Sequence, residues 1–133
     1  MGGQLIKPGG SVNILLAEDD NIFGGIIKSE LEEEGYAVDL VNNGVEAVLR
    51  FLDGPCDVFL SDIQMPKLDG IGALRIIRKL NRGVPAIVFS GNAGQDEIDE
   101  ALAAGAERHF AKPFRMEDLK DCIRNKLFIA AKS

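Results

Sequence analysis

Acidic side chains stand at the ends of two apolar runs, where a charge is costly unless something pairs with it. The run "VNILLA" leads into Glu18, Asp19 and Asp20, and the run "VFLS" leads into Asp62. Two carboxylates about 4 Å apart repel by ~4 kcal/mol at an effective dielectric constant of ~20. A divalent cation relieves this repulsion, and oxygen ligands without His or Cys suit Mg²⁺. If the two run ends meet, they form a magnesium site; otherwise Glu18 to Asp20 simply cap the following helix.

A hydroxyl and an ammonium group follow two later apolar runs. Ser90 ends the run "VPAIVFS", and Lys112 follows "RHFA" in the segment "AKPF". A lysine can neutralise phosphoryl oxygens as a point charge, and a serine can donate one hydrogen bond to such an oxygen. Each residue taken alone is typical of a turn or of a solvated surface charge.

Five short apolar runs alternate with segments whose apolar residues recur every three or four positions. The predicted strands cover residues 12–17, 36–41, 56–61, 84–90 and 108–111. Strict alternation predicts an α/β fold, with a doubly wound five-stranded parallel sheet covered by helices on both faces. The common flavodoxin-like strand order, 2-1-3-4-5, places the ligand crevice beyond the carboxyl ends of the first and third strands. Asp62 would meet Glu18 and Asp19 there.

The length and composition predict one globular domain. We expect a flexible leader at 1–11, the domain at 12–129 and a short tail at 130–133. The net charge of −6 leaves no excess of Lys and Arg for direct nucleic-acid binding. No apolar run approaches the ~20 residues that span a membrane, and no signal peptide is evident, so we expect a cytoplasmic protein without a membrane partner.

Residues 12 to about 127 resemble the receiver domain of two-component response regulators, of the type of the chemotaxis regulator. The resemblance rests on "EDD", "SDIQMPKLDG", "FSG" and "AKPF", in this order and at the expected strand ends. It implies that Asp62 accepts a phosphoryl group from a sensor histidine kinase or a phosphotransfer protein. It also implies that Mg²⁺ is held by Glu18, Asp19, Asp62 and the backbone carbonyl at Gln64.

The resemblance further assigns Lys112 and Ser90 to the phosphoryl oxygens and implies a cis Lys112-Pro113 bond. Such a protein is a signalling phosphoacceptor that catalyses its own phosphorylation and dephosphorylation, and it is not an enzyme acting on a separate substrate. Its phosphorylation would alter a face that binds a downstream protein target, through Ser90 and His109. Many receivers carry Tyr or Phe where this chain has His109.

Gly24 and Gly25 lie inside the first expected helix, where each glycine costs about 1 kcal/mol relative to Ala. We expect either a frayed first turn or a close approach to a neighbouring element.

Three other functions are compatible with parts of the pattern. A flavodoxin-like FMN carrier could share the strand order, although carboxylates after the first strand would repel its phosphate. A Mg²⁺-dependent phosphohydrolase could use an aspartyl-phosphate, but the chain has no cap domain. A pseudo-receiver would keep the fold and only bind partners, which the set of Glu18, Asp19, Asp62, Ser90 and Lys112 argues against.

Overall fold

Five strands alternate with five helices in the computed structural model, which describes residues 11–132. The strands are β1 (Asn13–Ala17), β2 (Ala37–Val41), β3 (Val58–Asp62), β4 (Ala86–Ser90) and β5 (Arg108–Ala111). The helices are α1 (Asn21–Glu33), α2 (Gly44–Asp53), α3 (Gly70–Leu80), α4 (Gln95–Ala103) and α5 (Met116–Lys132). The predicted βα alternation is confirmed.

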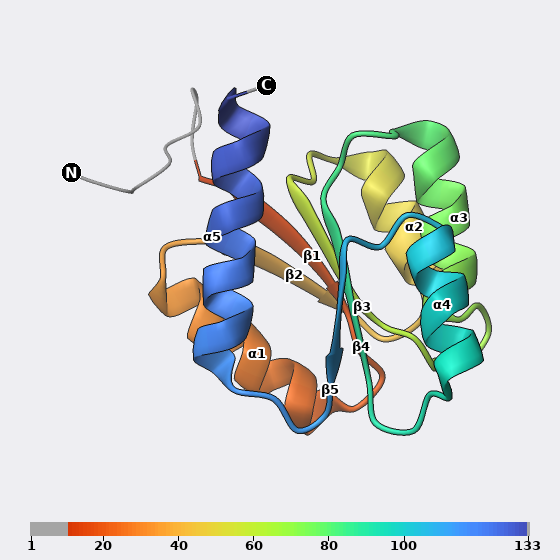
Figure 1. Cartoon of the computed structure of the whole chain (residues 1–133). Helices are drawn as coiled ribbons and strands as arrows, with labels where there is room; N and C mark the ends of the chain where they lie inside the picture. The colour runs from red at the N-terminus through yellow and green to blue at the C-terminus, as the bar shows by residue number, and fades with distance from the viewer. Residues whose placement is uncertain (1–10, 133) are drawn as a thin grey trace.

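All neighbouring strands are parallel, and their order is β2-β1-β3-β4-β5, as predicted. Helices α1 and α5 cover one face of the sheet, and α2, α3 and α4 cover the other (Figure 1). This order brings the carboxyl ends of β1 and β3 together at the topological switch point.

The central strand β3 contributes to two hydrophobic cores because successive side chains point to opposite faces. Phe59 packs beneath α2, α3 and α4, whereas Val58 and Leu60 pack beneath α1 and α5. Every residue of β3 is buried. Burial on both faces explains why this run is continuously apolar up to Ser61 rather than alternating.

The predicted boundaries differ from the observed ones mainly at strand beginnings. β3 starts at Val58, two residues later than predicted, and the Asp57 carboxylate just before it accepts a hydrogen bond from the backbone N–H of Asn13. At the other end of the chain, α5 continues through Lys132, beyond the expected domain limit at residue 129. The expected leader lies outside the described residues except for Ser11.

Helix α1 runs unbroken through both of its glycines. It is capped by Asp20, whose side chain accepts hydrogen bonds from the backbone N–H groups of Ile22 and Phe23. A Cβ at Gly24 would lie 3.1 Å from Leu40 Cδ1 and 3.3 Å from Glu18 Cγ. Close packing of α1 on the sheet edge is therefore the explanation that the structure supports.

No helix within residues 11–132 is both long and apolar enough to cross a membrane.

Replacing Gly25 by alanine should raise the free energy of unfolding by about 0.5–1 kcal/mol, because the helix interior gains propensity and the Cβ would meet nothing within 4 Å. Gly24→Ala is the matched control and should gain less or destabilise, since its Cβ would press on Leu40. Urea denaturation followed by circular dichroism measures both. Equal gains for the two variants would contradict the packing described for Gly24.

Candidate functional site

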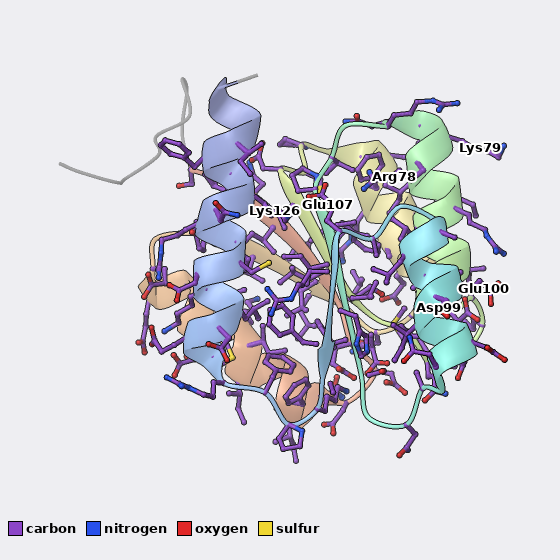
Figure 2. All side chains as sticks on the ribbon, viewed as in Figure 1. Arg78, Lys79, Asp99, Glu100, Glu107 and Lys126 are labelled. Carbon is purple, nitrogen blue, oxygen red and sulfur yellow. The ribbon has the colours of Figure 1, made fainter. Side chains whose placement is uncertain are left out.

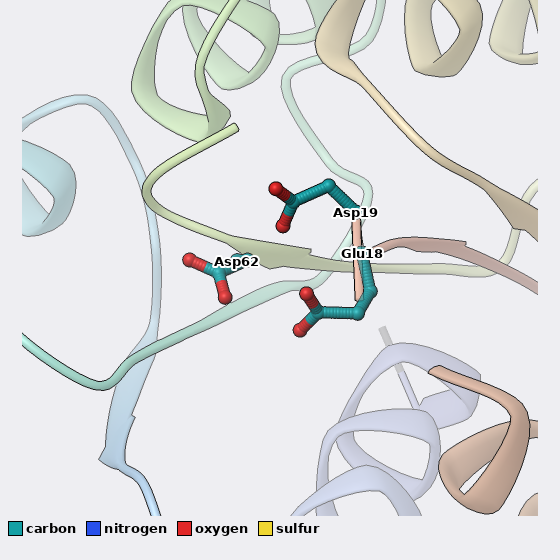
Figure 3. A group of neighbouring side chains, drawn as sticks. All are labelled: Glu18, Asp19 and Asp62. Carbon is teal, nitrogen blue, oxygen red and sulfur yellow. The ribbon is translucent and has the colours of Figure 1, made fainter. Parts of the chain in front are cut away.

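Three carboxylates gather at the carboxyl edge of the sheet. Glu18 and Asp19 directly follow β1, and Asp62 is the last residue of β3, which pairs with β1. One carboxylate oxygen from each residue lies within 4.8 Å of the others. Figure 3 shows the three side chains converging from the two strand ends. The two acidic run ends therefore meet, as the sequence predicts.

The three carboxylates differ in burial. Glu18 is completely buried, Asp62 is buried and Asp19 is exposed. Burial raises the pKa of Glu18 to about 7, although hydrogen bonds from the Asp20 backbone N–H and from Lys112 oppose that rise. The backbone N–H of Asp20 lies 3.0 Å from Glu18 Oε2. Asp20 itself caps α1, so within the acidic segment the capping interpretation applies to Asp20.

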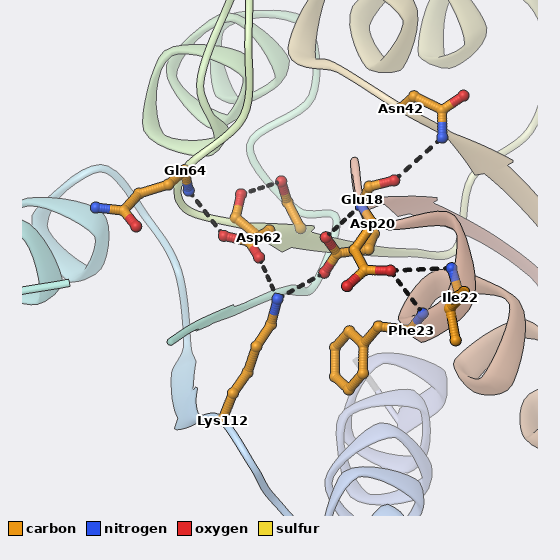
Figure 4. A network of polar contacts seen from close by, with 9 residues as sticks. Glu18, Asp20, Ile22, Phe23, Asn42, Asp62, Gln64 and Lys112 are labelled. Atoms are coloured by element: carbon orange, nitrogen blue, oxygen red, sulfur yellow. Dashed lines mark hydrogen bonds and ion pairs between the residues drawn. The ribbon is translucent and has the colours of Figure 1, made fainter. Parts of the chain in front are cut away.

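Lys112 connects the two buried carboxylates. Its Nζ lies 2.9 Å from Glu18 Oε1 and 2.5 Å from Asp62 Oδ2 (Figure 4). Burial alone would lower the pKa of Lys112, but its hydrogen bonds with Asp62 and Glu18 outweigh burial and raise it. The Lys112-Pro113 bond is cis, as predicted. Lys112 is thus a charged group inside the site rather than a solvated surface lysine.

Asp62 is held from a second side by the loop that follows β3. The backbone N–H of Gln64 donates to Asp62 Oδ1 at 2.8 Å. The two oxygens of Asp62 therefore accept hydrogen bonds from Gln64 and from Lys112, which fixes the orientation of the carboxylate. The predicted role of the Gln64 carbonyl as a metal ligand stays a prediction.

Ser90 ends β4, one residue beyond Phe89, which lies opposite Asp62 in the strand register. Its side chain is buried, and its Oγ lies 2.8 Å from His109 Nε2 on the neighbouring strand β5. Burial lowers the pKa of His109. Ser90 and His109 are therefore in direct contact, and this hydroxyl is engaged with the imidazole.

Aromatic rings lie beneath the lysine, and the sequence pattern did not assign them to the site. Lys112 Nζ lies 4.5 Å from the centroid of the Phe23 ring and 5.6 Å from that of Phe89. Phe23 recurs at helical spacing and is indistinguishable by pattern from an ordinary core residue. Asn42 was also missed; its amide donates to the backbone carbonyl of Glu18 at 3.2 Å and to Asn21 Oδ1 at 2.8 Å.

The donor set fits a magnesium ion. All three side chains offer hard oxygen ligands, and Mg²⁺ commonly binds through one or two carboxylates while keeping water molecules. Asp19 forms no hydrogen bond or ion pair with any other residue of the described range, so its carboxylate is available to a cation. The other two carboxylates are already oriented by Lys112, Gln64 and Asp20.

The sequence pattern that defines the response regulator receiver domain matches residues 14–124. The chain therefore belongs to the response regulator receiver domain family of two-component signalling. Its αβ order and strand order are those expected for this family.

Curated relatives cover most of this chain. It is 32% identical to the transcriptional regulatory protein RprY of Bacteroides fragilis over 81% of the chain, and 33% identical to the response regulator MprA of Mycobacterium bovis over 82%. It is also 29% identical to the probable histidine kinase 1 of Oryza sativa subsp. indica over 86%. The chain spans only 46%, 47% and 15% of these three proteins, respectively.

Solved structures share the fold closely. The CheY-like receiver domain protein of Methanospirillum hungatei superimposes with a TM-score of 0.89 at 29% identity, covering 92% of this chain and 98% of that one. The receiver domain of the sensor histidine kinase PA1611 of Pseudomonas aeruginosa gives 0.81 at 34% identity, covering 89% and 98%. That structure has a magnesium ion coordinated in its active site cleft.

The raised pKa of Glu18 predicts a pH-dependent stability in protein freed of divalent cations. The carboxyl titrates near 7 when folded and has an ordinary value of 4.5. Between these values the folded state binds more protons than the unfolded state, so this contribution to the free energy of unfolding falls as pH rises through that window. Urea denaturation of the wild type and of Glu18→Gln, at a series of pH values with chelator, isolates the contribution. A difference between the two proteins that stays constant with pH would contradict it.

Proposed function

We propose that this receiver domain accepts a phosphoryl group on Asp62 from a phosphorylated histidine of a sensor histidine kinase or a phosphotransfer protein. The observation that carries the proposal is the position of the Asp62 carboxylate, between the Lys112 ammonium and the carboxylates of Glu18 and Asp19. An ionised carboxylate needs no general base to act as a nucleophile.

In the transfer, an oxygen of Asp62 forms a bond to phosphorus while the bond from phosphorus to the histidine nitrogen breaks. The imidazole leaves, and Asp62 becomes an acyl phosphate. Lys112 is already within hydrogen-bond distance of Asp62, so its ammonium is placed to pair with a phosphoryl oxygen once the group is attached. The Gln64 N–H holds the other oxygen of the carboxylate during the attack.

Magnesium would be held by Glu18, Asp19, Asp62 and the backbone carbonyl of Gln64, and it would supply positive charge next to the transferring oxygens. Each residue has a separate part in holding it. Asp19 offers a carboxylate that no other residue between 11 and 132 engages, whereas Glu18 accepts hydrogen bonds from Lys112 and from the Asp20 N–H. A bound cation would also neutralise part of the negative charge of the three carboxylates, so that an anionic phosphodonor could approach them.

Because the chain belongs to the receiver domain family, neither an FMN carrier nor a separate phosphohydrolase is needed to explain the acidic site. The pseudo-receiver differs from the proposed function only in whether Asp62 is phosphorylated. Relatives include a protein named as a probable histidine kinase, a transcriptional regulatory protein and a response regulator. This range supports a histidine phosphodonor as the upstream partner and a protein target downstream, in a cytoplasmic signalling pathway.

Acetyl phosphate with Mg²⁺ should add one phosphoryl group to the protein, and intact-mass analysis should detect it. The adduct should be absent in Asp62→Asn and should form much more slowly in Asp19→Asn at the same Mg²⁺ concentration, because a carboxylate that holds the cation is lost. Asp69→Asn is a matched control outside the cluster, since Asp69 caps α3, and it should label at the wild-type rate. Persistent labelling of Asp62→Asn would refute the acceptor assignment.

Phosphorylation is proposed to reach the surface through Ser90 and His109. A phosphoryl group on Asp62 would offer a new acceptor near the end of β4, and the Ser90 hydroxyl, now 2.8 Å from His109 Nε2, would move toward it. The imidazole then loses its partner at 2.8 Å and is free to change rotamer on β5. The face formed by α4, β5 and α5 would thereby report the state of the site to a protein target.

NMR of the imidazole tests this coupling, and the chain has a single histidine, so its ring signals are unambiguous. Beryllofluoride with Mg²⁺, standing in for the phosphoryl group, should shift the His109 ring signals, and Asp62→Asn should abolish the shift. The two-residue coupling is wrong if the Ser90 signals move while the ring signals and rotamer stay unchanged.

A further inference from the structure

Helix α2 presents an apolar stripe to solvent on the far side of the molecule from α1 and α5. Val45, Leu49 and Leu52 are spaced by four and three residues, which places them on one face of the helix. They are 43%, 54% and 58% exposed. The core contacts of α2 are made by Ala47, with Val48 and Phe51 packed against it, so these three apolar residues are not needed to hold the helix on the sheet.

The direction of this stripe follows from the ion pair of its neighbour Arg50. The guanidinium of Arg50 bonds to Asp39 on β2, which is the edge strand of the sheet. Arg50 thus occupies the flank of α2 that faces the sheet edge. The stripe lies on the other flank, toward α3 and solvent.

Helix α3 carries a second exposed apolar pair, Ile76 and Leu80, which are 39% and 50% exposed. The basic residues of α3 reach toward α4: Arg75 binds Glu100 at 2.9 Å, and Arg78 donates to the carbonyl of Gly105 at 2.8 Å. Figure 2 shows Arg78 and Lys79 on α3 and Glu100 on α4. Because Arg75 and Arg78 occupy the α4 flank, Ile76 and Leu80 lie on the flank that faces α2.

The two helices lie side by side, so the two sets adjoin. Leu68 joins their first turns, since its carbonyl accepts from the Gly44 N–H at 2.9 Å and its side chain lies against Gly72. We call this surface the α2–α3 patch; it consists of Val45, Leu49, Leu52, Ile76 and Leu80. A contiguous exposed apolar patch with a polar rim is characteristic of a protein interaction surface.

The rim of the α2–α3 patch has opposite charges on its two sides. On the α2 side, Glu46 and Asp53 lie near Arg50, which pairs with Asp39. Within residues 11–132 neither Glu46 nor Asp53 forms an ion pair of its own, so this side carries a net negative charge. Lys79 lies on α3 and Arg82 in the turn that follows this helix, and neither has an acidic partner within residues 11–132. Across the two helices, the surface therefore has a net acidic edge beside α2, an apolar centre and a basic edge beside α3.

We propose that the α2–α3 patch is where two copies of this chain associate, about a two-fold axis that runs along the groove between α2 and α3. A rotation about that axis places α2 of each copy against α3 of the other, so each acidic edge meets a basic edge. The alternative two-fold axis, across the helices, would oppose α2 to α2 and bring like charges together. Asp53 and Lys79 both lie in the last turn of their helices, which makes them matching partners across the first arrangement.

This association goes beyond phosphotransfer at Asp62. The patch contains none of the residues proposed to hold the phosphoryl group or the cation, and Asp62→Asn should leave self-association unchanged. Loss of acetyl phosphate labelling and loss of association are therefore separable results.

Sedimentation velocity of the full chain over a wide concentration range is the test. The wild type should pass from monomer to dimer, and Leu49→Lys should remain monomeric over the same range. Ile22→Lys is the matched control, since Ile22 is an equally apolar, 78% exposed residue on α1, and it should dimerise like the wild type. Circular dichroism spectra verify that both variants are folded.

A charge-exchange set identifies the two-fold axis. Asp53→Lys and Lys79→Asp should each weaken dimerisation, and the double variant should restore it, because each acid again meets a base. A wild type that stays monomeric at all concentrations overturns the proposal, as does a dimer that tolerates Leu49→Lys. Dimerisation that depends on Leu49 but is unaffected by the two single charge reversals would overturn the proposed arrangement.

Discussion

The ammonium group of Lys112, placed between the carboxylates of Glu18 and Asp62, is the interaction on which the arrangement of the site depends. Both carboxylates are buried, and a buried charge is destabilising unless an opposite charge or hydrogen bonds compensate it. Lys112 supplies that compensation from a loop 50 residues beyond Asp62 and 94 beyond Glu18. The carboxyl ends of β1, β3 and β5 must therefore be held in register for the charges to meet.

A parallel sheet satisfies this requirement because all of its strands deliver their following loops to the same edge. Acid, hydroxyl and ammonium groups can then come from segments far apart in sequence while each strand stays apolar and buried on both faces. The ammonium group of Lys112 also lies over the faces of the Phe23 and Phe89 rings, which favour a cation at this position. Lys112 therefore contacts both the aromatic rings of the core and the carboxylates of the site.

Much of this could be predicted because burial imposes a pattern on the sequence. Strands buried on both faces are apolar runs, and Asp62 stands out since it ends such a run.

The contact of Ser90 with His109 could not be predicted in this way. It depends on the register of β4 against β5 and on side-chain rotamers, and the composition of the two strands indicates neither of them. Gly24 was ambiguous for the same reason, because only the three-dimensional approach of Leu40 distinguishes a close contact from a weak helix. Lys67, with a φ of 68°, occupies the left-handed region in the loop after β3. The sequence "MPKLDG" does not indicate this, because Asp69, two residues later, is of a type that adopts this conformation more often.

The unequal burial of Glu18 and Asp19 gives the two adjacent acids different physical roles. Glu18 is enclosed and has both oxygens engaged, so it stabilises the position of Lys112 and cannot reorient without breaking those bonds. Asp19 is exposed and unengaged within the described residues, so a cation can reach it from solvent without any rearrangement of the core. A cation bound mainly at this exposed acid and at Asp62 could exchange while the buried pair of Glu18 and Lys112 keeps the crevice in shape. In the proposed phosphotransfer, this separation would let Glu18 and Lys112 preserve the geometry of the crevice while the phosphoryl group and the cation bind and leave.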